Sequence, residues 1–266
     1  FGVFIMIVVK FGGHAMKDEN GNFAKAISAA LATGEKVVVV HGGGPQIDAA
    51  LKAQQITSAW IGGFRVTTQE IFNVVEEVLV NQVGQEVATT LSKSGIKARA
   101  ISARELPTVI AKRRTTLIDG TPADLGFVGE VQSVNPAQLL ELIEDGFVPV
   151  VAPVSSDVDL ITGLNVNADF AAASIAAALG ASQLIVMTDV PGIYRNWPDK
   201  SSLIDSITAH DLEAIKAGFA EGMAPKVQAA LDALSYGAQA VRIIDGTDPD
   251  SFASALAGTG GTLVVA

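Results

Sequence analysis

The sequence contains no cysteine among its 266 residues. That absence excludes disulfides, thiolate zinc sites, iron–sulfur clusters and cysteine nucleophiles, so the chemistry must come from Lys, Arg, Asp, Glu, Asn and backbone groups. Basic residues are also scarce, because 18 Lys and Arg stand against 28 Asp and Glu and give a formal net charge of −10. A general nucleic-acid binder binds phosphates through clustered Lys and Arg side chains. Because basic residues are scarce in this sequence, we expect no nucleic-acid partner. Any anionic ligand must be held by local groups against the overall field.

Long hydrophobic runs are missing as well. No stretch of about twenty uncharged apolar residues occurs, and the apolar residues 1–9 lack a basic leader and a small-residue cleavage site. We therefore expect no membrane partner, a cytoplasmic location, and a buried strand at the start of the chain. With 49% hydrophobic residues the chain can bury a substantial core, which excludes a disordered or fibrous protein.

Short Val- and Ile-rich runs alternate with longer segments of helical pattern. Near-continuous apolar strands between helices predict an α/β fold with a mainly parallel sheet covered on both faces. The strands expected in that sheet are residues 5–9, 37–40, 148–151, 184–187, 240–244 and 263–265. Helical periodicity is clearest at residues 45–53, 68–92, 168–179 and 225–234.

The middle of the chain differs from this alternation. Residues 107–112 and 127–131 are β-like runs joined by a polar, turn-rich segment, so we expect an antiparallel pair appended to the main sheet. No internal repeat or flexible linker is visible. We expect one continuous domain with an N-terminal lobe at residues 1–163 and a C-terminal lobe at residues 164–266.

Two glycine-rich loops follow the first two predicted strands. Lys10 ends the first strand and precedes Gly12 and Gly13, while the second strand runs into three glycines at 42–44 and then Pro45. Ligands of open parallel sheets bind beyond the carboxyl ends of the strands, and a helix that starts at Pro45 attracts an anion to its N-terminus. The spacing matches neither the P-loop nor the G-x-G-x-x-G pattern. The alternative, that these glycines only make tight turns, leaves Lys10 as an unpaired lysine at the rim of an apolar strand.

Five ordered motifs give the chain a specific resemblance. They are Val8-Val9-Lys10-Phe11-Gly12-Gly13, Val39-Val40-His41-Gly42-Gly43-Gly44-Pro45-Gln46-Ile47, Gly63-Phe64-Arg65-Val66-Thr67, Leu164-Asn165-Val166-Asn167-Ala168-Asp169 and Thr188-Asp189-Val190-Pro191-Gly192. In this order they resemble the amino-acid kinase family, and within it the acetylglutamate kinases, nearly end to end. The resemblance implies a three-layer sandwich with an open, mainly parallel sheet of about eight strands between helical layers, as the strand pattern also indicates.

The resemblance also implies a role for each site residue. The N-terminal lobe would bind the acyl amino acid and form the dimer, and the C-terminal lobe would bind ATP. The catalytic residues would be Lys10, Asp169 and Lys226. The substrate would be bound by Gly43, Gly44, Arg65 and Asn165, and the transferring phosphate by Gly12 and Gly13. ATP would be bound by Thr188, Asp189, Gly192, Ile193, Tyr194, Gly222 and Met223.

Elementary electrostatics supports part of this assignment. Two lysines that converge on one phosphate repel each other, and a carboxylate such as Asp169 relieves that repulsion. Lys226 follows Pro225 at a predicted helix start, where the dipole disfavours a cation, so an anionic ligand is expected nearby. A planar guanidinium at Arg65 suits a carboxylate ligand. The alternatives are that Arg65 and Lys226 are surface residues and that Asn167 only caps a helix.

Metal ligands are not expected. His14, His41 and His210 lack metal-ligand spacing, and His41 reads as a hydrogen-bonding residue at a strand end. Mg²⁺ is expected to be bound through the phosphates of ATP, because no carboxylate cage is present in the sequence.

The resemblance implies ATP-dependent phosphorylation of the side-chain carboxylate of N-acetyl-L-glutamate, a step of arginine biosynthesis. A carrier-bound aminoadipate or glutamate kinase of lysine biosynthesis, and a non-catalytic nucleotide-binding regulator, are the alternatives. Residues 101–109 lack the Gly-rich run that many relatives carry there. Arginine-inhibited members have an extra N-terminal helix and a C-terminal signature that this sequence does not show. We therefore expect a homodimer without feedback inhibition by arginine.

Overall fold

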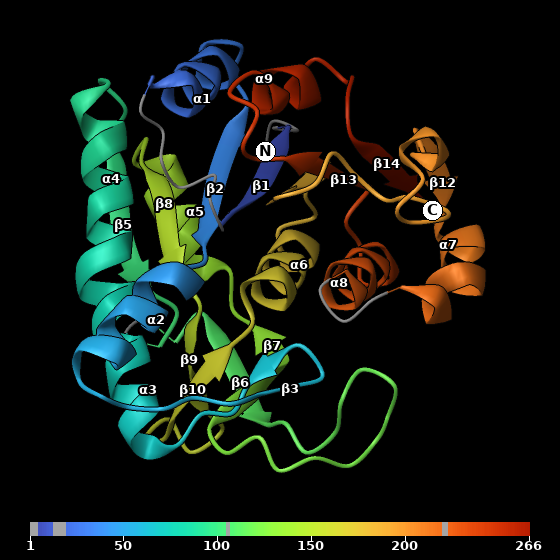
Figure 1. Cartoon of the computed structure of the whole chain (residues 1–266). Coiled ribbons are helices and arrows are strands. Elements are labelled where there is room, and N and C mark those ends of the chain that lie inside the picture. Colours follow the sequence, from blue (N-terminus) through green and yellow to red (C-terminus); the bar gives the residue numbers. More distant parts are fainter. Residues whose placement is uncertain (1–4, 13–19, 105–106, 220–222) are drawn as a thin grey trace.

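The structure is a computed structural model that describes residues 5–12, 20–104, 107–219 and 223–266. Its centre is an eight-stranded sheet in the order β12-β14-β13-β11-β1-β2-β8-β5 (Figure 1). Every neighbouring pair is parallel except β13 with β14. The strands are β1 (Met6–Phe11), β2 (Lys36–His41), β5 (Ala98–Ser102), β8 (Val148–Ala152), β11 (Gln183–Thr188), β12 (Ser206–Thr208), β13 (Ala240–Asp245) and β14 (Thr262–Val265). The α/β fold and its mainly parallel sheet are confirmed.

Helices cover both faces of this sheet. On one face Val8 packs with residues of α5 (Ala137–Glu144), α6 (Ala168–Ala178), α7 (Ala209–Ile215) and α8 (Ala224–Ser235). On the other face Val9 packs with residues of α1 (Asn22–Ala32), α2 (Gly44–Ala53), α3 (Gln69–Glu76), α4 (Gly84–Lys93) and α9 (Ser251–Leu256). The described chain also has the short 3₁₀ helices η3 (Lys200–Ser202) and η4 (Lys216–Gly218). Successive side chains of a strand point to opposite faces, so buried Val8 and Val9 each require a helical layer.

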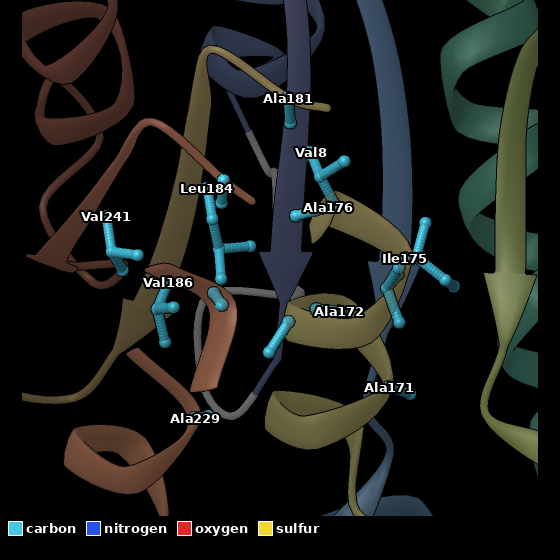
Figure 2. Packing of buried hydrophobic residues seen from close by; sticks show 14 of the residues in the cluster. Val8, Ala171, Ala172, Ile175, Ala176, Ala181, Leu184, Val186, Ala229 and Val241 are labelled. Carbon is cyan, nitrogen blue, oxygen red and sulfur yellow. The ribbon is translucent and has the colours of Figure 1, made fainter. Parts of the chain in front are cut away.

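Helix α6 packs closely against the centre of the sheet. Figure 2 shows Ala172 and Ala176 of α6 near Val8 of β1 and near Leu184 of β11, in the largest of the three apolar clusters of the described residues. Alanine ends at Cβ, so the helix backbone can approach the strands closely. The short alanines of α6 thus hold its N-terminus near the ends of β1 and β2.

The helical pattern at residues 68–92 is not one regular helix. It divides into α3, the π-helix η2 (Glu77–Val83) and α4. Thr68 caps α3, because its hydroxyl accepts a hydrogen bond from Ile71 N at 3.2 Å. Single-turn π segments are often found at functional sites, and η2 lies beside the cavity described below.

The prediction of an appended β-pair is half right. Strands β6 (Val109–Arg113) and β7 (Val128–Val134) do pair antiparallel. They join a separate closed sheet with β9 (Val154–Asp157) and β10 (Gly163–Val166), so the expectation that they extend the main sheet is wrong. Pro153 separates β8 from β9 and has no N–H to continue the ladder. A two-stranded hairpin, β3 (Trp60–Ile61) and β4 (Phe64–Arg65), lies apart from both sheets.

Candidate active site

The ends of β1 and β2 bring the two glycine loops together. In the register of these strands Phe11 lies beside His41, and Gly42 N donates to Phe11 O at 2.8 Å. A Cβ on Gly12 would lie 2.8 Å from Lys10 Nζ, so the lysine side chain folds back over the backbone of Gly12. Lys10 therefore reaches beyond the strand end toward the start of α6.

Three helices begin at one cavity of about 490 Å³. Its lining includes Gly44 at the start of α2, Ala168 at the start of α6 and Pro225 in the first turn of α8. The first N–H groups of a helix have no partner within the helix and carry a partial positive charge. The cavity is therefore suited to an anion, in a protein whose net charge is −10.

Lys10, Asp169 and Lys226 form a buried ion cluster at this cavity. Lys10 Nζ lies 3.1 Å from Asp169 Oδ1, and Lys226 Nζ lies 3.4 Å from Asp169 Oδ2. Burial alone would raise the pKa of Asp169, but the charges of Lys10 and Lys226 outweigh it and lower the pKa to about 2. At neutral pH the cluster thus holds two cations around one anion. The surface alternative for Lys226 does not fit, because its side chain is only 17% exposed.

The start of α6 fixes the position of the carboxylate. The Asn167 side chain caps the helix by accepting from Asp169 N at 2.8 Å. The helix-capping interpretation of Asn167 is thereby confirmed. Asp169 itself lies in the first helical turn, where the helix dipole favours a negative charge.

Arg65 is held in the cavity wall by half of its guanidinium group. Its Nη1 donates to Asp48 Oδ1 at 2.7 Å and to Ser58 Oγ at 2.8 Å, and its Cζ lies 4.6 Å from the Trp60 ring centroid. Nη2 is buried without a hydrogen-bond partner. Arg65 is 5% exposed, which excludes the surface alternative. A buried unpaired N–H is costly, so Nη2 is a strong candidate for binding a ligand oxygen.

Asn165 and Arg65 are linked through one threonine. Asn165 Nδ2 donates to Thr67 Oγ1 at 3.1 Å, and Thr67 Oγ1 donates to Arg65 O at 2.8 Å. Both Asn165 and Arg65 line the cavity. The chain of hydrogen bonds therefore fixes β10 relative to the β3–β4 hairpin at the cavity wall.

Gly43 and Gly44 lie where the sequence places them, at the start of α2. A Cβ on Gly43 would lie 2.5 Å from Leu79 Cδ2 of η2, whereas a Cβ on Gly44 would meet no atom within 4 Å. Gly43 thus allows η2 to approach the loop. Gly44 leaves the first turn of the helix open to a ligand.

The residues expected to bind ATP lie elsewhere. Thr188 ends β11 and is followed by Asp189, Gly192, Ile193 and Tyr194, and none of these residues lines the 490 Å³ cavity. Ile193 is fully buried and its N–H donates to Thr262 Oγ1 at 2.8 Å, so this loop is packed against β14. Met223 directly precedes α8 and thus lies near Lys226 in the chain, while Gly13 and Gly222 fall outside the described residues. An ATP-binding role for these residues stays a prediction.

His41 is buried at the end of β2, and its Nδ1 donates to Gly42 O at 2.9 Å. The hydrogen-bonding role expected for it is confirmed. Burial lowers the pKa of His41 to about 4, so the ring is neutral at physiological pH.

Sequence reasoning missed the partners that orient Arg65. Asp48 and Ser58 carry no local signal, because they lie 17 and 7 positions from Arg65 and meet it only in the folded chain. In the described part of the chain no group of three His, Asp or Glu side chains is arranged to hold a metal ion. No helix of the described residues is long and apolar enough to cross a membrane.

Comparison with known proteins decides the family. The sequence profile of the amino acid kinase family matches residues 6–245. The chain belongs to the amino acid kinase family. The acetylglutamate kinase of Nocardia farcinica (strain IFM 10152) is 45% identical to this kinase over 246 residues, which are 92% of this chain and 81% of the relative.

Two further relatives agree. The acetylglutamate kinase of Beutenbergia cavernae is 44% identical over 247 residues, 92% of this chain and 79% of the relative. The crystal structure of smu.665 from Streptococcus mutans UA159 superposes with a TM-score of 0.82 at 28% identity and covers 98% of both chains. The resemblance drawn from the motifs is confirmed.

Proposed function

We propose that this amino acid kinase transfers the γ-phosphoryl group of ATP to the side-chain carboxylate of N-acetyl-L-glutamate, the acyl-phosphate step of arginine biosynthesis. The observation that carries the proposal is the buried cluster of Lys10, Asp169 and Lys226 at the meeting point of three helix N-termini. The curated relatives named acetylglutamate kinase, at 44–45% identity over 92% of the chain, supply the substrate.

The acyl amino acid would lie between Arg65 and the start of α2. The unpaired Nη2 of Arg65 suits the α-carboxylate, because the other half of the guanidinium group is already fixed by Asp48. Asn165 would hydrogen-bond the acetylated amine, and the apolar side chains of the lining, such as Val128 and Val166, would surround the acyl chain. The side-chain carboxylate would then point toward Lys10.

The reaction needs positioned charge rather than a base. A side-chain carboxylate is already an anion at neutral pH, so one of its oxygens attacks the γ-phosphorus while the bond to the β,γ-bridging oxygen breaks and ADP leaves. The main barrier is repulsion between two anions, which Lys10, Lys226 and the N–H groups of Gly12, Gly43 and Gly44 would offset. Asp169 would keep the two lysines together before ATP binds. The backbone N–H of Gly13 belongs to the same proposal.

The described site fits Mg²⁺ that is carried by ATP. Asp169 is the acidic residue among the described lining residues, and both of its oxygens already face lysines. Such a carboxylate is a poor metal ligand, so Mg²⁺ would be bound through the phosphates and would neutralise their charge. The adenosine part would be bound by Thr188 at the end of β11, by Asp189, Gly192, Ile193 and Tyr194 of the loop after it, and by Gly222 and Met223 before α8.

Two wider features belong to the same proposal. We infer a cytoplasmic enzyme, because that is where ATP is supplied, and a homodimer. β5 is one of the two outer strands of the main sheet, and within the described residues it has no neighbouring strand on its outer side, which gives a second copy a place to pair. Light scattering after size exclusion measures the mass, and a monomer at micromolar concentration would contradict the dimer.

An ADP-release assay with N-acetylglutamate, glutamate, aspartate and carbamate tests the function, with hydroxylamine to trap the acyl phosphate. We expect a hydroxamate with N-acetylglutamate and at most trace product with the others, because only the acylated amine matches Asn165. Activity restricted to a carrier-linked aminoadipate or glutamate would favour the lysine-biosynthesis kinase. ATP binding without product from any of these acceptors would favour a non-catalytic regulator.

A further inference from the structure

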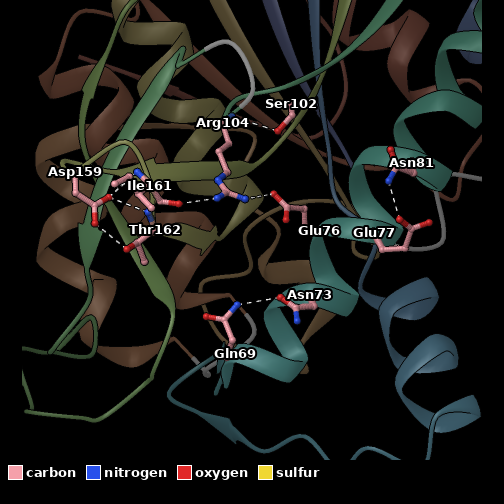
Figure 3. Close-up of polar contacts among 10 residues, drawn as sticks. All are labelled: Gln69, Asn73, Glu76, Glu77, Asn81, Ser102, Arg104, Asp159, Ile161 and Thr162. Carbon is pink, nitrogen blue, oxygen red and sulfur yellow. Dashed lines mark hydrogen bonds and ion pairs between the residues drawn. The ribbon is translucent and has the colours of Figure 1, made fainter.

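Arg104 follows β5 and joins two elements that are far apart in the chain. Its Nη1 donates to Glu76 Oε1 of α3 at 2.5 Å, and its Nη2 donates to Ile161 O of the β9–β10 turn at 2.7 Å (Figure 3). Its own N–H donates to Ser102 Oγ at 3.2 Å. The planar guanidinium can bind two acceptors in fixed directions, which a lysine cannot do.

The β9–β10 turn offers a well-fixed acceptor. Asp159 Oδ1 accepts from the N–H groups of Ile161 and Thr162, both at 2.8 Å, and Asp157 N donates to Thr162 O at 2.8 Å. Figure 3 shows Asp159, Ile161 and Thr162 on one side of Arg104 and Glu76 on the other. Arg104 therefore connects an ordered turn to the last residue of α3.

Tight packing accompanies these hydrogen bonds. The Phe72 ring of α3 lies 5.8 Å from Arg104 Cζ, and a Cβ on Gly163 would lie 3.1 Å from that same Cζ and would overlap the Phe72 ring. Gly163 is the first residue of β10. The ring, the guanidinium group and the glycine backbone thus fill one space between α3 and β10.

A second connection joins the same two elements at the cavity. Thr67 directly precedes the cap of α3, and its hydroxyl accepts from Asn165 Nδ2 of β10 at 3.1 Å. Helix α3 and strand β10 are therefore held together at two places, by Thr67 with Asn165 at the cavity and by Arg104 away from it. Arg104 does not line the cavity.

We propose that Arg104 is a positioning residue for the acyl-amino-acid site, which fixes Asn165 relative to Thr67 and Arg65 by bridging α3 and the β9–β10 turn. The inference rests on the proposed function. Since the pair with Glu76 is about one third exposed, its direct charge attraction is weak, and its effect comes from orientation. Loss of a group that orients a ground-state contact weakens substrate binding more than it slows the chemical step.

The first test is steady-state kinetics of Arg104→Ala. We expect the KM for N-acetylglutamate to rise about tenfold, with kcat and the KM for ATP within about twofold of the parent. Arg104→Lys and Glu76→Gln each keep part of the bridge, so intermediate values are expected. Asn81→Ala is the matched control, because Asn81 is exposed and donates to Glu77 Oε2 at 2.7 Å within η2 itself. An unchanged KM for N-acetylglutamate, or equal changes for both substrates with a lowered Tm, would overturn the inference.

A second readout does not depend on the substrate. In Arg104→Ala we expect amide hydrogen exchange in residues 161–166 to speed up relative to Asn81→Ala, because the turn before β10 loses its link to α3. Unchanged exchange there would also overturn the inference. An inactive parent enzyme with N-acetylglutamate would instead contradict the proposed function, so the two failures are distinct.

Discussion

The charges of single residues explain how an acidic protein can bind a triphosphate. Lys10 and Lys226 share Asp169, so the cluster keeps one net positive charge in a buried site. Buried charges interact more strongly than exposed ones because water screens them less. The lysines are therefore effective where they stand, although the chain as a whole carries a charge of −10.

Removing either lysine should slow the chemical step. We expect Lys10→Ala and Lys226→Ala each to lower kcat by about 10²-fold or more, as loss of a donor to the transferring phosphoryl group does. Steady-state kinetics with saturating substrates measures the effect. Lys112→Ala is the control, because Lys112 is half exposed on β6, pairs with Glu130 at 3.8 Å and does not line the cavity. Full kcat in Lys10→Ala would refute its role.

Arg65 and Asp48 should act on binding. Arg65→Ala removes the proposed α-carboxylate ligand, so we expect the KM for N-acetylglutamate to rise about 10²-fold with a smaller change in kcat. Asp48→Asn keeps Arg65 but weakens the 2.7 Å pair that fixes Nη1, so a rise of a few fold is expected. Steady-state kinetics with varied N-acetylglutamate measures both KM values. An equal loss in the two variants would mean that Asp48 contacts the ligand itself.

Between elements, Gly43 sets the distance between α2 and η2. In Gly43→Ala the new Cβ would lie 2.5 Å from Leu79 Cδ2, so we expect a loss of about 1–3 kcal/mol in the free energy of unfolding. Gly44→Ala is the matched control, because a Cβ there meets no atom within 4 Å. Urea titration gives both values. In a Leu79→Ala background the same Gly43→Ala change should cost less, and an equal cost there would place the strain elsewhere.

Among the strands, the sequence pattern predicted the central ones and missed those at the edges and in the closed sheet. The central strands β1, β2, β8 and β11 are near-continuous apolar runs buried on both faces, so their pattern alone predicted them. The outermost strands β5 and β12 escaped prediction because β5 mixes exposed and buried residues and β12 is three residues long. The closed sheet escaped because its pairing joins strands from separate parts of the chain, which local pattern does not encode.

For the site, the strand ends and glycine loops predicted where ligands bind. The family motifs predicted that Lys10, Asp169 and Lys226 are the catalytic residues. The structure brings these three residues together, as expected. The orientation of Arg65 by Asp48 and the bridge formed by Arg104 depend on residues that are 17 and 28 positions apart. Such pairs depend on tertiary structure and leave no periodic signal in the sequence.

At the scale of the whole molecule, the buried side chain of His41 makes the free energy of unfolding depend on pH. Its ring is buried at the end of a central strand, and Nε2 has no hydrogen-bond partner. Protonation would place a second N–H in the core without an acceptor, which is costly. Burial accordingly lowers the pKa of His41 from 6.5 to about 4.

The sign of the effect on stability follows from these two values. Between about pH 6.5 and 4 the unfolded chain binds a proton at this histidine and the folded chain does not, so the free energy of unfolding rises with pH across that window. The difference of about 2.5 pH units corresponds to about 3 kcal/mol, which is lost as the pH falls from 6.5 to 4. Asp169, whose pKa is lowered to about 2, contributes stability above its unfolded value near 3.8 and loses it below the window of His41.

His41→Asn isolates this contribution, because an amide can keep the hydrogen bond to Gly42 O but does not titrate. We expect the variant to be less stable at pH 7.5, since a cavity replaces the ring, yet to lose less stability than the parent on acidification to pH 4.5. Urea titrations of both proteins at several pH values measure how the free energy of unfolding of each changes with pH. The other titrating groups are the same in both proteins, so the difference between the two slopes reports on His41. Parallel curves for the parent and His41→Asn would mean that the acid sensitivity of the fold arises from other residues.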